Sequence, residues 1–189
     1  AHSGVLTCEV MAVSGATETL SWTAYDCASD PTATVGDTGG EYCDVEGDDA
    51  CALSFRAVDR AGNISATATR AFSIDWAPPA ATINAPAASS WQRDDFIVDV
   101  ANFDSGSGVD VCEYKVVNDS STTLDWTVYD CATDPTLTVG DSGGENCSVE
   151  GADICEVSFR LTDRAGNSSA VSSRVFGIDW TPPVILTGG

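Results

Sequence analysis

An internal repeat constrains this chain more than any other feature, because it recurs with an offset of 104 residues. When residues 3–85 are aligned with residues 107–189 without gaps, 47 of the 83 positions are identical. The offset maps every cysteine of the first half onto a cysteine of the second half, and Trp22 onto Trp126. Such self-similarity indicates tandem copies of one folding unit. Any predicted fold must therefore fit into about 100 residues and occur twice.

Two Pro-Pro pairs mark the boundaries between the copies. Pro78-Pro79 and Pro182-Pro183 each follow an Asp-Trp pair and are typical of linkers. We predict a complete domain over residues 78–181, and a first copy over residues 1–77 that lacks its first two strands. Residues 182–189 are predicted to begin a further repeat or to act as a donor strand. The chain is therefore expected to be a slice of a longer array, or a protein whose first domain is completed by another chain.

Apolar residues in the complete copy alternate with a period of two, which is typical of half-buried strands. Seven short strands are expected, near residues 80–84, 94–102, 110–117, 122–130, 136–139, 155–162 and 170–178. This number of short strands in about 100 residues predicts an all-β chain of tandem immunoglobulin-like β-sandwiches. We expect Trp126, with Leu124 and Val128 in the same phase, to form the aromatic centre of the core, and Trp22 to be its twin.

The charge balance excludes several classes of partner. The chain has 29 acidic and 8 basic residues, a net charge of -21, so its field repels nucleic acid and anionic membranes. No apolar run approaches the roughly 18 residues that a membrane span needs. The single histidine, His2, stands at the start of the sequence, which excludes any mechanism that needs an interior histidine.

Eight cysteines without a CxxC pair favour structural disulfides over zinc. Structural disulfides indicate an oxidising compartment outside the cytoplasm. Four cysteines per copy allow three connectivities. A hairpin centred on Gly151 would pair Cys147 with Cys155, and a hairpin turning at residues 118–121 would bring Cys112 near Cys131. The offset then extends this prediction to the pairs Cys43–Cys51 and Cys8–Cys27.

One motif invites an enzymatic interpretation. Asp37-Thr38-Gly39 and Asp141-Ser142-Gly143 match the D-[ST]-G signature of aspartic proteases, which share one proton between two carboxyl groups. Each triplet follows a glycine in a polar stretch, however, and any tripeptide occurs twice in a duplicated chain. We interpret both triplets as parts of Gly-rich turns. Without a second histidine or a phosphate-binding loop, we expect no enzyme and no catalytic residues.

Several short motifs follow each other in a fixed order in the second copy. They are Ser107-Gly108-Val109, Tyr114, Asp163-Arg164-Ala165-Gly166-Asn167 and Asp179-Trp180-Thr181-Pro182-Pro183. Residues 59–63 and 75–79 match the last two in the first copy. In this the chain resembles the bacterial Ig-like repeats of large extracellular and cell-surface proteins. The resemblance implies a spacer, stalk or adhesin module located outside the cell or on its surface.

Acidic residues gather where consecutive Ig-like domains are expected to meet. In such an array the last strand of one domain leads to the loops at the near end of the next. The residues expected at this junction are Asp75, Asp104, Asp110, Asp163 and Asn167. Carboxylate and amide oxygens suit calcium, which takes 6–8 oxygen ligands. Alternatively, Asp163 and Asn167 cap a hairpin turn, and Asp104 and Asp110 face water.

These observations predict a structural or adhesive repeat module that forms a rod-like stalk or filament, stapled by disulfides and rigidified by calcium. Its expected partners are neighbouring Ig-like repeats, or chains of the same type in a polymer. One alternative is a filament subunit assembled by strand complementation between chains. A second is a carbohydrate-binding module of a secreted protein, for which the sequence offers no unique aromatic platform. Neither nucleic acid nor a membrane span is expected.

Overall fold

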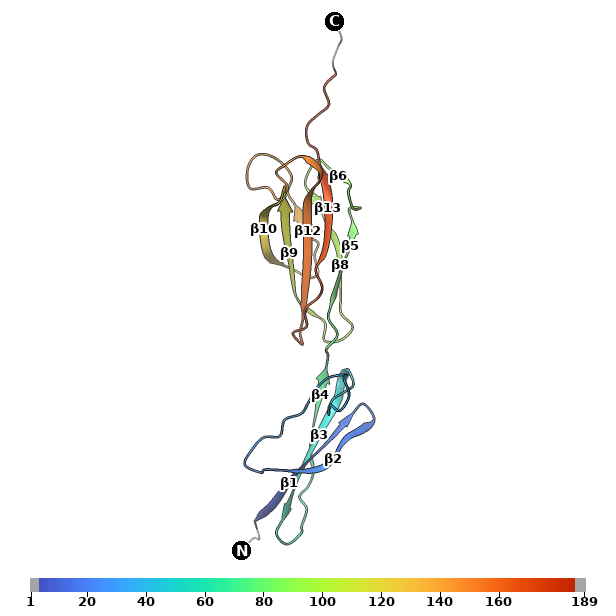
Figure 1. Cartoon of the computed structure of the whole chain (residues 1–189), viewed down its shortest axis with the longest axis vertical. Coiled ribbons are helices and arrows are strands. Elements are labelled where there is room, and N and C mark those ends of the chain that lie inside the picture. Colours follow the sequence, from blue (N-terminus) through green and yellow to red (C-terminus); the bar gives the residue numbers. More distant parts are fainter. Residues whose placement is uncertain (1–3, 186–189) are drawn as a thin grey trace. The chain divides into compact units, whose positions relative to one another are not determined.

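The structure, a computed structural model, describes residues 4–185 and divides into two compact units (Figure 1). Unit 1 covers Ala1–Trp76 and unit 2 covers Ala77–Gly189. All regular elements in residues 4–185 are strands, which confirms the predicted all-β class. Within these residues no helix exists that could cross a membrane. In the predicted terminal segment, residues 182–185 are exposed and outside any strand, and residues 186–189 lie outside the described residues.

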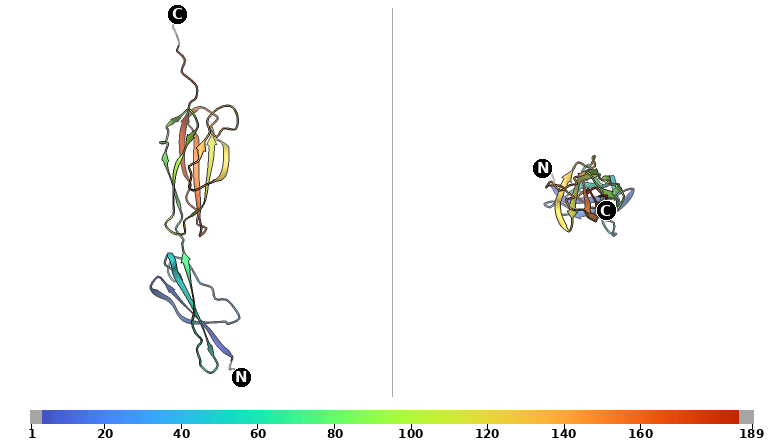
Figure 2. Two further views of the ribbon diagram at one scale, coloured as in Figure 1. Left: turned by 180° about the vertical axis from the view of Figure 1, so that it is seen from behind. Right: turned by 90° about the horizontal axis from the view of Figure 1, so that it is seen from above.

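Unit 2 contains one large sheet and two smaller strand pairs (Figure 2). The large sheet has the order β10-β9-β12-β13-β6. Its strands are β6 (Trp91–Gln92), β9 (Val109–Asn118), β10 (Ser121–Tyr129), β12 (Gly151–Asp163) and β13 (Ser172–Ile178). The pairs are β5 (Ala80–Ala85) with β8 (Asp99–Phe103), and β7 (Phe96–Ile97) with β11 (Thr136–Leu137). In β12 alternate side chains are buried, as the period of two predicts, whereas β13 ends with three consecutive buried residues.

The core of unit 2 lies between the large sheet and the two strand pairs. Phe159 and Phe176 of the large sheet are fully buried, as are Val98 and Leu137 on the opposite side. Phe96 packs edge-on against Phe176, with 5.0 Å between the ring centroids. Because both layers supply buried side chains to one cluster, unit 2 is a β-sandwich.

Trp126 is not at the centre of this core, so the sequence-based expectation is wrong for it and for Val128, which is 66% exposed. Leu124 pairs with Val116 and Thr127 pairs with Tyr114, so β10 has an extra residue between these pairs. This bulge reverses the alternation of side chains. Trp126 consequently lies on the outer face, where the Arg160 guanidinium is 4.3 Å from its ring centroid.

The strand expected over residues 94–102 is divided into β7 and β8, which pair with different partners. The division falls at Val98, whose amide donates to the Pro135 carbonyl oxygen at 2.9 Å. The amide of Val100 then donates to Asp134 Oδ1 at 3.0 Å. These two bonds satisfy the backbone where the ladder is interrupted, so the segment crosses from one partner strand to another without losing hydrogen bonds.

Unit 1 contains a single sheet with the order β2-β1-β3-β4. The strands are β1 (Val5–Ser14), β2 (Thr17–Tyr25), β3 (Gly47–Asp59) and β4 (Ala68–Ile74). They match β9, β10, β12 and β13 of unit 2 in order and pairing, as the repeat predicts. The fully or largely buried apolar cluster is small and consists of Ala12, Cys43, Cys51 and Leu53.

Each of the two units contains two disulfides. In unit 1 Cys8 is bonded to Cys27 and Cys43 to Cys51, and in unit 2 Cys112 to Cys131 and Cys147 to Cys155. These are the four predicted pairs. The expected hairpin centred on Gly151 is not present, however, because Gly151 begins β12 and pairs with Ile178, while Cys147 forms a bridge with Val139. Each unit has one disulfide with a sequence separation of 19 residues and one with a separation of 8, so the same two disulfides recur in both copies of the fold.

Candidate functional site

Two loops at one end of unit 2 carry the acidic residues of interest. The first follows β8 and is organised by Asp104, whose Oδ2 accepts hydrogen bonds from the amides of Gly106 at 3.2 Å and Gly108 at 2.6 Å. Gly108 has a φ of 87°, a conformation that favours glycine. The carboxylate therefore folds the Ser/Gly-rich loop around itself.

The second loop follows β12 and is organised by Asp163, which is only 2% exposed. Its Oδ1 accepts a hydrogen bond from the Asn167 amide, and its Oδ2 accepts one from the Asn167 side-chain Nδ2, both at 2.8 Å. Gly166 closes the turn with a φ of 95°. The capping role considered for Asp163 and Asn167 is thus present in the structure, and it holds the carboxylate in one orientation.

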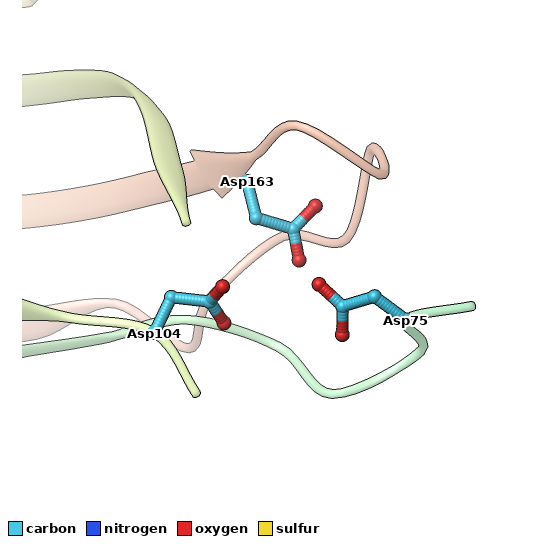
Figure 3. Close-up of side chains that lie close together, drawn as sticks. All are labelled: Asp75, Asp104 and Asp163. Carbon is cyan, nitrogen blue, oxygen red and sulfur yellow. The ribbon is translucent and has the colours of Figure 1, made fainter. Parts of the chain in front are cut away.

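The two loops bring Asp104 and Asp163 together. Each carboxylate has one oxygen within 4.8 Å of an oxygen of the other, and Figure 3 shows both side chains at the loop ends. Asp104 Oδ1 is buried and, within residues 4–185, accepts no hydrogen bond. A buried carboxylate oxygen without a partner is energetically costly. Two close carboxylates and one such oxygen fit the preference of calcium for hard oxygen ligands.

The other predicted ligands occupy different positions. Asn167 lies in the Asp163 turn and is half-buried. Asp110 is exposed on β9 and lies outside the group of close carboxylates. Asp75, also labelled in Figure 3, belongs to unit 1, where it follows β4 directly and is half-buried.

Unit 1 repeats only part of this arrangement. Asp59 accepts hydrogen bonds at Oδ1 from the amides of Ala61 and Asn63, and at Oδ2 from the Asn63 side chain. The turn is therefore the same as at Asp163. The residue aligned with Asp110 is Leu6, so unit 1 carries one acidic residue fewer at this end. Asp59 thus provides a natural comparison for Asp163.

A second arrangement that both units share, and that was not predicted from the sequence, lies on the outer face of the four-stranded sheet of unit 1 and of the large sheet of unit 2. Arg160 donates two hydrogen bonds to Glu113, at 2.6 Å and 3.0 Å, and its guanidinium covers the ring of Trp126. In unit 1 Arg56 donates one hydrogen bond to Glu9, at 2.6 Å, and its guanidinium covers the ring of Trp22. The signal was present in the repeat, because all three residue types recur with the same offset. Cation–π contact and ion pairing together fix these long side chains on the sheet.

The hydrogen bonds from Arg160 lower the pKa of Glu113 below its ordinary value. A carboxyl group whose pKa is lowered by folding stabilises the fold above its unfolded pKa, and this stabilisation is lost as the pH falls through the folded pKa. We therefore expect Glu113→Gln to destabilise unit 2 at pH 7, and to have a smaller effect at a pH below the ordinary glutamate pKa of about 4.3. Urea unfolding at both pH values measures this. Glu156→Gln, which removes the same charge from β12 away from Arg160, is the control. A Glu113→Gln effect that is equal at both pH values would contradict the expectation.

The two D-[ST]-G triplets lie in separate units and serve as turns. Ser142 Oγ donates to Glu145 Oε1, and the Gly143 amide donates to Glu145 Oε2 at 2.7 Å. The bond from Ser142, followed by backbone amides, lowers the pKa of Glu145. Thr38 Oγ1 makes the same contact with Glu41 in unit 1. These bonds agree with the interpretation of the triplets as parts of Gly-rich turns.

Comparison with known proteins decides the family. The sequence model of the bacterial Ig-like domain matches residues 24–76 and 82–180, which is more than half of the chain. The chain belongs to the bacterial Ig-like domain family. Domains of this kind are generally structural rather than enzymatic, and together with the four disulfides they support an extracellular structural module.

Two solved structures are similar to this chain. The fibronectin(III)-like modules of CbhA from Clostridium thermocellum are 15% identical, with a TM-score of 0.40, and the match covers 94% of this chain and 81% of theirs. A 1.5-MDa bacterial ice-binding adhesin, studied for its retention on the host cell surface, is 15% identical with a TM-score of 0.49. That match covers 93% of this chain and 54% of the adhesin chain. No curated protein matches the chain.

Proposed function

We propose that this chain is a non-catalytic spacer of a bacterial cell-surface protein, in which tandem Ig-like units form a rod-like stalk stiffened by calcium. The observation that carries the proposal is the recurrence of one disulfide-stapled unit with the same sheet order and the same pairs of bridges. Disulfides stabilise each unit by restricting its unfolded chain, which suits a protein outside the cell. Repetition of one unit lengthens the protein without requiring a different fold. Both features serve a mechanical role.

A spacer accounts for the outward-facing tryptophans Trp22 and Trp126 better than a sugar-binding role does. Trp22 and Trp126 lie on the outer faces of the sheets, where rings could stack on a carbohydrate. Arg56 and Arg160 instead cover these rings, at 4.0 Å and 4.3 Å from their centroids. The aromatic faces are thus used within the units, where they brace neighbouring strands.

The calcium part of the proposal starts from Asp104 and Asp163. Their close carboxylates, with the unpartnered oxygen of Asp104, supply the first ligands. Ala80 pairs with Phe103, so Pro79 lies opposite Asp104 in unit 2. Asp75 is four residues before Pro79, a span of at most about 14 Å along the chain, so it can reach the same ion. Asn167 would add an amide oxygen, and Asp110 would add negative charge at this end. An ion bound by residues on both sides of the linker would restrict bending between the units.

Calcium titration of the full chain tests this proposal. Isothermal titration calorimetry is expected to detect a site that Asp104→Asn or Asp163→Asn weakens at least about tenfold, since each removes one charged ligand. Asp59→Asn, the same change in the matching turn of unit 1, should leave the affinity unchanged. Chelation should also broaden the distance distribution from small-angle X-ray scattering and increase proteolysis near Trp76. If Asp59→Asn weakens binding as much as Asp163→Asn, or chelation changes neither property, the proposal is wrong.

A further inference from the structure

Unit 1 has an open apolar face on the side of its sheet that carries the small core. A groove of about 230 Å³ lies between strands β3 and β4 and the loop that joins β2 to β3. It is lined by Ala33, Val35, Cys43, Leu53, Phe72, Ser73 and Ile74. Phe72 is 39% exposed and Val35 is 55% exposed. Their partners in the repeat are better covered, because Phe176 is fully buried and Val139 packs against the core. The same sequence position thus has a different environment in the two units.

Unit 2 shows what covers this face. Its residues 80–103 contain β5, β7 and β8, and this segment places Ile83, Phe96, Val98 and Val100 over the sheet. Phe96 packs edge-on against Phe176, and the other three side chains are buried with it. Among residues 4–76, unit 1 presents the same sheet order without this cover.

The groups that receive this segment in unit 2 are retained in unit 1. The Pro135 carbonyl accepts from Val98, Asp134 accepts from Val100, and the Val139 amide donates to Asp95. Arg174 donates to the backbone oxygens of Ile83 and Pro86. The corresponding residues of unit 1 are Pro31, Asp30, Val35 and Arg70. In unit 1, Arg70 lies over the ring of Phe72 instead, with 5.9 Å to the centroid.

The outer edge of the sheet also differs between the two units. In unit 2, β13 is covered by β6, since Gly177 donates to the Ser90 carbonyl and Ser89 donates to the Val175 carbonyl. In unit 1, β4 is the last strand of its sheet within residues 4–185. An uncovered edge beside an apolar groove is a template for strand addition.

We propose that the open face of unit 1 binds a strand-forming segment with the sequence pattern of residues 80–103, carrying a small residue where unit 2 has Trp91. The last condition comes from Gly177. A Cβ at that position would lie 2.8 Å from the Trp91 ring, which is too close for a real contact. Unit 1 has Ser73 at the position of Gly177, so a segment with tryptophan there would collide with the serine Cβ.

A second copy of this chain is not the occupant, because its own segment is already used. Val98 is fully buried and Phe96 is 9% exposed within unit 2. Donating this segment to another chain would uncover Phe176 and Leu137, which are both fully buried. The exposed area would equal what the acceptor gains, so exchange offers no net burial. The occupant is therefore an additional segment of the same type.

Synthetic peptides of residues 78–104 test the proposal on the full chain. A peptide with Trp91→Gly is expected to bind, and to shift the NMR signals of Val35, Phe72 and Ser73. The unaltered peptide should bind about tenfold more weakly or worse, because the tryptophan overpacks against Ser73. In a Ser73→Gly chain this order should reverse, since the ring then has the glycine that it contacts in unit 2. Both partners are acidic, so calorimetry is best done at about 0.15 M salt.

Two chain variants separate this site from non-specific binding. Phe72→Glu introduces a charge into the groove and should abolish peptide binding, whereas Leu6→Glu, at a side chain that is 62% exposed and outside the groove, should not. Binding that survives Phe72→Glu, or equal binding of a scrambled peptide, would overturn the proposal. So would Phe72-dependent dimers of the chain alone in sedimentation velocity, because the occupant would then be a second copy.

Discussion

Phe176→Ala is expected to destabilise unit 2 by about 3–5 kcal/mol, because it deletes a fully buried ring from a packed core. The ring contacts Phe96 edge-on, and the two-layer core around it offers no solvent to fill the space. The same substitution in unit 1, Phe72→Ala, should cost less than about 1.5 kcal/mol, because this side chain is 39% exposed. The two phenylalanines occupy the same position in the repeat, yet their substitutions are expected to have different costs.

Hydrogen exchange under native conditions measures the two changes separately. Peptides from β12 report on unit 2 and peptides from β3 report on unit 1, and the loss of protection gives the change in the free energy of unfolding. Phe159→Ala, at another fully buried ring of unit 2, is the positive control. Equal costs for Phe176→Ala and Phe72→Ala would contradict the difference in burial on which the open face of unit 1 depends.

Removal of the Cys147–Cys155 bridge by a double alanine substitution should destabilise unit 2 by about 2–4 kcal/mol. The bridge spans 8 residues, and both cysteines are fully buried against the core. The unfolded chain therefore gains loop freedom, and the folded core loses two packed sulfur atoms. Urea unfolding of the oxidised proteins, followed by β12 exchange, gives the magnitude.

The Cys112–Cys131 bridge provides the matched comparison. It spans 19 residues, so loop entropy alone makes its removal costlier than that of the shorter bridge by roughly 0.8 kcal/mol. Mass spectrometry of non-reduced peptides should first find these two pairs. A change below about 0.5 kcal/mol for either double variant would show that the bridges do not restrict the unfolded chain as the entropic account requires.

The candidate cation site was only partly predictable. Asp163 and Asn167 stand four residues apart, so one local turn brings them together, and their motif marks them in the sequence. Asp104 lies 59 residues before Asp163. Its proximity depends on β8 and β12 ending at the same end of the unit, which follows from the strand order. Asp110 was expected with them, but at the start of β9 it is exposed and lies outside the group of close carboxylates.

Local pattern was least informative where the backbone departs from regular pairing. The bulge in β10 turns Trp126 outward, and the alternation of residue types gives no sign of the extra residue. The break at Val98 is stabilised by the carbonyl of Pro135, which is distant in sequence. The residues of the Arg160–Glu113–Trp126 group recur in the repeat, but their contact was not predicted because it joins three different strands. Each feature depends on which strands become neighbours.

By itself the sequence determined the repeat, the all-β class, the family and the four short-range cysteine pairs, because these depend on residue periodicity, ordered motifs and short separations along the chain. Only the tertiary structure decided which face Trp126 takes, which carboxylates approach each other and which apolar face of unit 1 stays uncovered. Those outcomes depend on contacts between strands far apart in the chain. A residue's burial is a property of the layer packed against it, and that layer is encoded elsewhere in the sequence.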